Sequence, residues 1–61
     1  MEKLMLTPEE VADALGIGRS TVYDLLRLNA IVSVKIGRSR RVPVTAVREY
    51  AERLTQASLT R

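Results

Sequence analysis

The sequence predicts a small α+β domain in which three helices pack around a two-stranded β-hairpin. Three observations support this prediction: two neighbouring segments near the N-terminus have apolar residues at helical spacing, residues 32–36 alternate in steps of two, and a third helical stripe follows Pro43. With 61 residues, the chain has room for one domain, whose small core buries roughly 60% of the unfolded chain's surface. We therefore expect a single domain over residues 1–61, ordered from about 4 to 55.

The first helix is predicted to run from about Pro8 to Leu15. Thr7 is suited to cap its free N–H groups, Pro8 fits the first helical position, and Glu10 completes a capping box. Gly16 then suits the position of positive φ at which the helix ends in a Schellman-type turn. The inward stripe follows the i, i+3, i+4, i+7 spacing and consists of Pro8, Val11, Ala12 and Leu15.

The second helix is predicted to begin at Gly18 or Arg19 and to continue to about Leu28. The spacing of a helix-turn-helix is seen in Ala12, Gly16 and Val22. In that motif a small residue lets the two helices touch closely, and Val22 fills the gap between them. This spacing points to DNA binding. The residues of the second helix expected to face inward are Val22, Leu25 and Leu26.

The outward face of the second helix combines hydroxyl groups with charges of both signs. In a helix-turn-helix this face enters a major groove ~12 Å wide, where hydroxyl and guanidinium groups meet base edges and phosphates. Its first turn also offers free backbone N–H groups and a favourable dipole to phosphate. The alternative is an ordinary polar helix face. The candidate major-groove residues are Arg19, Ser20, Thr21, Tyr23 and Arg27.

A hairpin, or wing, is predicted after the second helix. Residues 32–36 alternate between apolar and polar side chains and are rich in β-branched types. Gly37-Arg38-Ser39 is typical of a hairpin tip, residues 40–42 form the return strand, and Pro43 ends it. Because a two-stranded hairpin is barely stable alone, its apolar residues are expected to pack on the helices: Val34, Ile36 and Val42.

The wing is also rich in cations. Arginines around a glycine-bearing turn form a narrow projection that suits the negative potential of a minor groove, and Arg38 is the foremost candidate. The alternative is that these charges only protect an edge strand from aggregation. The candidate wing contacts, to a minor groove or to the DNA backbone, are Lys35, Arg38, Arg40 and Arg41.

The net charge of +3 is unevenly distributed. Residues 19–41 hold six cations and one anion (6 − 1 = +5), whereas the remainder holds four cations and six anions (4 − 6 = −2). A basic middle between acidic helices is expected of a surface that meets phosphates, although a solvated charged face is the alternative.

The third helix is predicted from Val44 or Thr45 to about Thr55, and residues 56–61 are expected to form a frayed tail. Its apolar stripe closes the core with Val47, Tyr50, Ala51 and Leu54. Two i, i+4 ion pairs are expected on its solvent side, Arg48–Glu52 and Glu49–Arg53.

Composition argues against several classes of protein. The chain has no Cys and no His, so it lacks the usual zinc ligands, a disulfide and the commonest general base. We therefore expect no enzymatic activity, no metal and no cofactor. No apolar run approaches the ~20 residues that span a bilayer, and residues 1–6 lack the apolar core of a signal peptide. These features favour a cytoplasmic protein without membrane contacts.

Three segments resemble the excisionase family of MerR-like winged-helix DNA-binding proteins. They are Leu6–Tyr23, Val34–Arg38 and Arg41–Pro43, and the resemblance extends from about Leu4 to Leu54. Many regulators share the helix-turn-helix part. The combination with an Ile-Gly-Arg wing and a short closing helix is more restrictive.

The resemblance implies how the chain meets DNA. It places the second helix in a major groove through Arg19, Ser20, Thr21 and Tyr23, and Arg38 and Arg41 of the wing on an adjacent minor groove or backbone. Arg40 departs from the family, in which an apolar or aromatic residue often occupies this position, so we expect it to reach phosphate. Asp24 suits backbone contact less well than a base would; it either accepts from cytosine or tunes neighbouring arginines.

The function implied is that of a recombination directionality factor of a phage or mobile element. Such a protein binds repeated sites beside an attachment sequence, self-associates cooperatively, bends the DNA and helps a separate tyrosine or serine integrase, on the nucleoid of a prokaryotic host. One alternative is a small MerR-like transcriptional regulator, although we expect no effector domain or long dimerisation helix after Leu54. The other is a protein-interaction module whose basic face binds an acidic partner.

Overall fold

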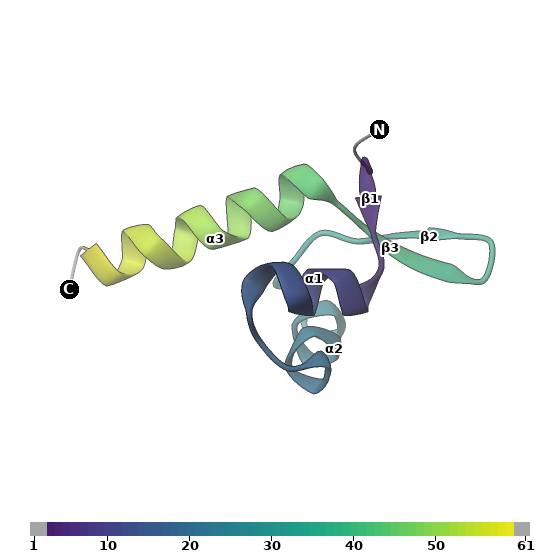
Figure 1. The fold of residues 1–61 in the computed structure, drawn as a ribbon, viewed down its shortest axis with the longest axis horizontal. Helices are drawn as coiled ribbons and strands as arrows, with labels where there is room; N and C mark the ends of the chain where they lie inside the picture. The colour runs from purple at the N-terminus through teal and green to yellow at the C-terminus, as the bar shows by residue number, and fades with distance from the viewer. Residues whose placement is uncertain (1–2, 60–61) are drawn as a thin grey trace.

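The structure is a computed structural model that describes residues 3–59. Within them the chain forms three helices and three short strands (Figure 1). In chain order these are β1 (Met5–Leu6), α1 (Pro8–Leu15), α2 (Arg19–Arg27), β2 (Val34–Ile36), β3 (Ser39–Pro43) and α3 (Val44–Leu59). The predicted α+β architecture is confirmed, and both helices of the helix-turn-helix lie where the sequence places them.

The strands form one antiparallel sheet in the order β1-β3-β2. In the wing, β2 pairs with β3 through Val34↔Arg41, Lys35↔Arg40 and Ile36↔Ser39, and the turn between them is Gly37-Arg38. Gly37 has a φ of 61° and Arg38 does not have a positive φ, which is the pattern of a type II′ hairpin turn. Strand β1, which pairs with the other edge of β3, was not predicted, because two residues are too few to show a period.

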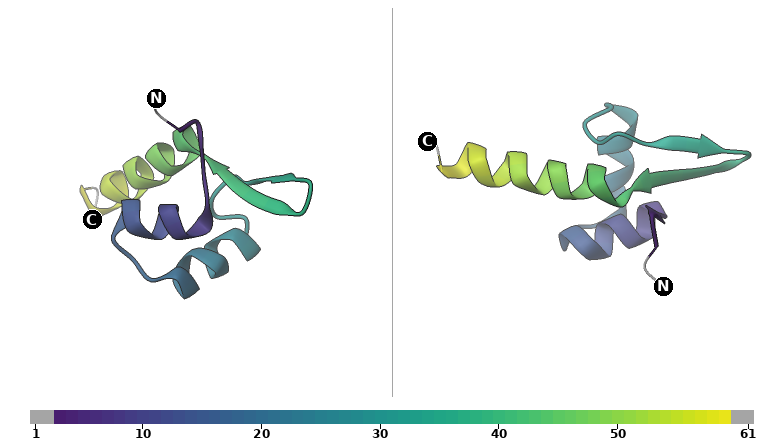
Figure 2. Two further views of the ribbon diagram at one scale, coloured as in Figure 1. Left: turned by 45° about the vertical axis from the view of Figure 1, so that its right-hand side comes forward. Right: turned by 90° about the horizontal axis from the view of Figure 1, so that it is seen from above.

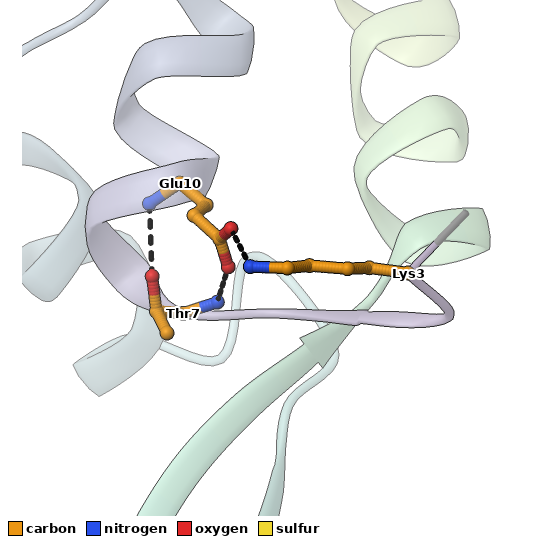
Figure 3. Close-up of polar contacts among 3 residues, drawn as sticks. All are labelled: Lys3, Thr7 and Glu10. Atoms are coloured by element: carbon orange, nitrogen blue, oxygen red, sulfur yellow. Dashed lines mark hydrogen bonds and ion pairs between the residues drawn. The ribbon is translucent and has the colours of Figure 1, made fainter. Parts of the chain in front are cut away.

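The ends of α1 follow from local sequence. The backbone N–H of Glu10 donates to Thr7 Oγ1 at 3.1 Å, and the backbone N–H of Thr7 donates to Glu10 Oε1 at 2.9 Å, which completes the predicted capping box (Figure 3). The Lys3 ammonium pairs with the other oxygen of the Glu10 carboxylate. At the far end Gly16 has a φ of 69°, and its N–H donates to the Asp13 carbonyl.

Helix α2 ends in the same way with a different residue. Asn29 has a φ of 58°, and the N–H of the following Ala30 donates to the Leu25 carbonyl at 2.9 Å. This bond spans the same interval as the one from Ile17 N–H to the Ala12 carbonyl after α1, so both helices end in Schellman motifs. Asparagine is the residue other than glycine that most readily adopts this conformation.

The core lies where α1, α2, β3 and the start of α3 meet. Two of its members were not predicted, Ile31 and Ala46, and Ile31 is only 1% exposed. The prediction that Leu54 closes the core is wrong: it is 51% exposed, because α3 runs past the edge of the two shorter helices (Figure 1). The buried apolar residues are Val11, Ala12, Val22, Leu26, Ile31, Val42, Ala46 and Val47, with Leu6, Leu15, Leu25 and Tyr50 partly buried against them.

The prediction that Val34 and Ile36 pack on the helices is wrong, whereas the same prediction for Val42 is confirmed. Val34 is 38% exposed and Ile36 is 58% exposed, whereas Val42 is fully buried. The register explains the difference, because residues that pair across an antiparallel ladder share a face and successive residues alternate. Val34 and Ile36 therefore lie on the face of Arg41, and Val42 lies on the opposite face with Arg40.

Helix α3 is longer than predicted. It continues to Leu59, so the frayed tail is wrong for residues 56–59, while residues 60–61 lie outside the described part of the chain. Neither ion pair predicted on α3 forms: within residues 3–59 the ion pairs are Lys3–Glu10 and Arg27–Asp24. Arg53 instead donates to the Ala30 carbonyl at 3.1 Å, with its guanidinium 5.7 Å from the centre of the Tyr50 ring. In Arg48–Glu52 the cation precedes the anion, which is the less favourable order on a helix.

The molecule measures 40 × 27 × 17 Å, and its long dimension runs from the wing to the end of α3 (Figure 1). The views in Figure 2 agree that the wing and α3 extend in opposite directions from the α1–α2 pair. None of the helices in residues 3–59 is long and apolar enough to cross a membrane. The fold is a winged helix-turn-helix, to which β1 adds a third strand.

Candidate nucleic-acid interface

Helix α2 presents every predicted contact residue to solvent. Arg19, Ser20, Thr21, Tyr23 and Arg27 are all exposed, while Val22 and Leu26 of the same helix are buried. Gly18 is the N-cap of α2 and gives no side-chain hydrogen bond to the first turn, in contrast to Thr7 before α1. The first turn of α1 is acidic, whereas that of α2 begins with an arginine. Of the two helix starts, that of α2 is the one suited to an anion.

A groove joins α2 to the wing. It is lined by Tyr23, Leu26, Arg27, Asn29 and Arg40. The pairing register explains the presence of Arg40, because this residue shares a face of β3 with the buried Val42 and so points to the side on which the helices lie. Its Nη1 donates to Ser33 Oγ at 2.8 Å, which links the guanidinium to the residue that precedes β2. The structure thus brings together residues of the helix and the wing that are distant in sequence.

The wing carries its cations on both faces and at its tip. Lys35 lies directly opposite Arg40 in the ladder, and like charges in such a pair destabilise a hairpin. Arg41 lies on the other face, and its Nη1 donates to the carbonyl of Arg40 at 2.9 Å. Arg38 is exposed in the turn itself. Concentrated like charge of this kind is relieved by an anion that spans the hairpin.

Carboxylates limit two of the candidate contacts. Arg27 forms an ion pair with Asp24 one turn earlier on α2, so its charge is partly neutralised within its own helix. The sequence suggested that Asp24 either accepts from cytosine or tunes neighbouring arginines. This ion pair corresponds to the second role. The second contact lies between helices: Tyr23 Oη donates to Glu9 Oε2 of α1 at 2.9 Å.

The hydrogen bond between Tyr23 and Glu9 shifts the pKa values of both groups. It is the largest cause of the lowered pKa of Glu9, which the backbone N–H of Glu9 and the charges of Arg19 and Arg41 lower further. The same bond, together with burial, raises the pKa of the Tyr23 hydroxyl. At neutral pH the pair is therefore an ionised carboxylate and a neutral phenol.

Comparison with known proteins identifies the family. A family model described as a helix-turn-helix domain matches residues 5–55. The chain is 50% identical over 52 residues to a "Probable excisionase" of Saccharopolyspora erythraea, covering 85% of this chain and 53% of that relative. It is 48% identical over 48 residues to an "Excisionase" of Streptomyces ambofaciens, covering 79% of this chain and 77% of that relative. The chain belongs to the excisionase family of helix-turn-helix proteins.

This membership confirms the predicted resemblance to excisionases. The matched residues include both helices of the helix-turn-helix, the whole wing and α3 as far as Thr55. The chain spans about half the length of the Saccharopolyspora relative. No solved structure is significantly similar to it. In residues 3–59 there is no group of three or more carboxylates placed to hold a metal ion.

Sequence reasoning missed two residues of this excisionase surface, Glu9 and Asn29. Glu9 had no predicted role, and its contact with Tyr23 joins residues 14 positions apart. Asn29 lines the groove because α2 ends in a left-handed residue that turns the chain toward the wing. A local signal for Asn29 existed, because Asn29 is the polar residue that follows the last turn of α2. No local signal reveals the contact of Glu9.

Proposed function

We propose that this excisionase-family protein binds double-stranded DNA with α2 in a major groove and the wing on the adjacent minor groove or backbone. The observation that carries this proposal is the groove that joins Tyr23 and Arg27 of α2 to Arg40 of the wing. One continuous surface then presents both elements to a duplex, while the acidic residues of α3 line a different groove, with Glu49 and Glu52. The candidate contacts remain Arg19, Ser20, Thr21, Tyr23 and Arg27 of α2, and Lys35, Arg38, Arg40 and Arg41 of the wing.

Salt dependence tests this proposal. A random duplex titrated at several salt concentrations is expected to lose affinity steeply, with log K falling by about 0.9 per phosphate neutralised for each log unit of salt. Arg38→Ala is expected to weaken binding to all sequences and to reduce the slope by about 1, because an exposed arginine at the wing tip has no structural role. Arg48→Ala, which removes another exposed arginine, this one from α3, is the matched control. Absence of duplex binding even at low salt would instead favour an acidic protein partner.

The biological role that we propose is non-enzymatic assistance to a separate integrase during excision of a mobile element. The names of both relatives support it. A single small module buries only about 600 to 1,000 Å² of its own surface on DNA, so several copies on neighbouring sites supply affinity and bending together. Footprints on the DNA beside an integrase gene are expected to show tandem protected repeats. A single protected site at a promoter would favour a transcriptional regulator, and strictly independent binding to multi-site DNA would contradict cooperative assembly.

A further inference from the structure

Glu9 is a carboxylate that neither the capping box nor the core of this protein needs. The capping box uses Glu10, and Glu9 is exposed in the same turn of α1. The hydrogen bond from Tyr23 Oη to Glu9 Oε2, at 2.9 Å, joins it to an α2 residue that is itself 49% exposed. A contact between two solvated groups adds little to folding stability, because both are equally well hydrated in the unfolded chain. Stability therefore does not account for this contact.

The position of Glu9 is also unfavourable for general attraction to DNA. The charges of Arg19 and Arg41 both act on its carboxylate, so it lies among the cations that the proposed function assigns to phosphates. A negative charge at that place repels the backbone of every duplex alike. Such a charge is useful only if it favours one way of docking over the others, since discrimination is a difference between affinities.

We propose that Glu9 is a specificity-determining residue of the DNA interface. Its carboxylate holds the Tyr23 side chain in one position on the exposed face of α2, and its charge repels phosphates that approach this face in any other register. Glu9 is thus a positioning residue for Tyr23 as well as a barrier to non-specific docking. This inference rests on the proposed DNA binding through α2.

The test compares a selected duplex with a scrambled one. The wild-type protein is used to enrich duplexes from a randomised pool, and dissociation constants are then measured for the enriched duplex and for a scrambled duplex of the same composition. Glu9→Gln is expected to bind the scrambled duplex more tightly and to lose about fivefold or more of the preference for the enriched duplex. Tyr23→Phe is expected to lose preference without gaining affinity for the scrambled duplex, because the carboxylate remains.

The double variant tests whether Glu9 acts through Tyr23 or whether the two residues affect the preference independently. If Glu9 acts through Tyr23, combining Glu9→Gln with Tyr23→Phe is expected to lose no more preference than the larger of the two single losses. Losses that multiply would overturn the positioning role. Glu49→Gln on α3 is the matched control for net charge, since it removes the same charge from an exposed site in the other groove. An equal effect of Glu9→Gln and Glu49→Gln on the preference would refute the inference.

The outcomes also distinguish this inference from the function on which it depends. A wild-type protein that binds no duplex overturns the proposed function and the inference together. A wild-type protein that binds duplexes but enriches none leaves DNA binding intact and overturns the role of Glu9. Thermal unfolding of each variant by circular dichroism checks that it is folded at the binding temperature; a small loss of stability is expected for Glu9→Gln, because the lowered pKa of Glu9 means that its ionised carboxylate favours the folded state.

Discussion

Ile31 and Ile36 are the same kind of side chain in neighbouring parts of the chain, and they have opposite environments. Ile31 is 1% exposed and packs among α1, α2 and the start of α3. We call these elements, together with Val42, the body. Ile36 is 58% exposed and lies at the end of β2 in the wing. The body is held by apolar packing, whereas the wing is held by its ladder and by the burial of Val42 at its base. The wing adds little to the core, and this leaves its side chains available for charge.

The largest expected effect that tests this comparison comes from truncating the two isoleucines. Ile31→Ala is expected to lower the free energy of unfolding by about 2 to 5 kcal/mol, since it opens a cavity in a fully packed site. A domain this small has only a few kcal/mol in total, so the variant is expected to be largely unfolded. Ile36→Ala is expected to change the free energy by about 0.5 kcal/mol or less. Urea unfolding measures both, and similar losses would show that the wing packs as firmly as the body.

A smaller effect is expected at the turn between the two helices of the body. Gly16 has a φ of 69°, and a Cβ built there meets no atom within 4 Å. Gly16→Val is therefore expected to cost about 1 to 3 kcal/mol through backbone strain alone, without a steric clash. Gly16→Asn is the matched control, because Asn29 already adopts the same conformation after α2, and it is expected to cost much less. An unchanged melting temperature of Gly16→Val would contradict this account.

In the wing, a substitution is expected to act on stability and binding with opposite signs. Lys35→Gln removes the like-charge pair with Arg40 and is expected to raise the free energy of unfolding by about 0.2 to 1 kcal/mol. It is also expected to weaken binding to a random duplex, because one cation of the surface proposed to face DNA is lost. Denaturation and DNA titration of the same preparation measure the two effects. A loss of stability would indicate that the Lys35 stem packs against the body.

The smallest effect is expected from pH, through the capping box of the body. The hydrogen bond from Lys3 and the backbone N–H of Thr7 lower the pKa of Glu10. Because this pKa is lower in the folded state than in the unfolded state, the carboxylate contributes stability above the unfolded pKa and loses it as pH falls through the folded pKa. Unfolding measured from pH 7 down to about pH 3 is expected to show a weaker pH dependence for Glu10→Gln than for the wild type. An equal pH dependence of the two proteins would contradict this account.

The sequence predicted the features of the fold that depend on neighbouring residues. The capping box and the end of α1 at Gly16 follow from interactions within a few positions, and both are confirmed. Strand register was harder to predict. Once the turn is Gly37-Arg38, parity places Val34 and Ile36 on the face away from Val42, but a period-two pattern alone does not tell which face is buried.

Length and distance limited the remaining predictions. Helix α3 outlasts its apolar stripe because residues 56–59 contain good helix formers and no Gly or Pro, so propensity continues the helix after packing ends. The burial of Ile31, which follows the end of α2, and the contact between Glu9 and Tyr23 both depend on how separate elements meet. The predicted DNA contacts of α2 are exposed as expected, and Arg40 joins their groove through its register.

The bond from Arg53 to the Ala30 carbonyl links α3 to the connection between α2 and the wing. That connection sets the spacing between the two elements that are proposed to contact adjacent grooves of a duplex. Loss of the bond would remove one contact between α3 and the connection on which that spacing depends.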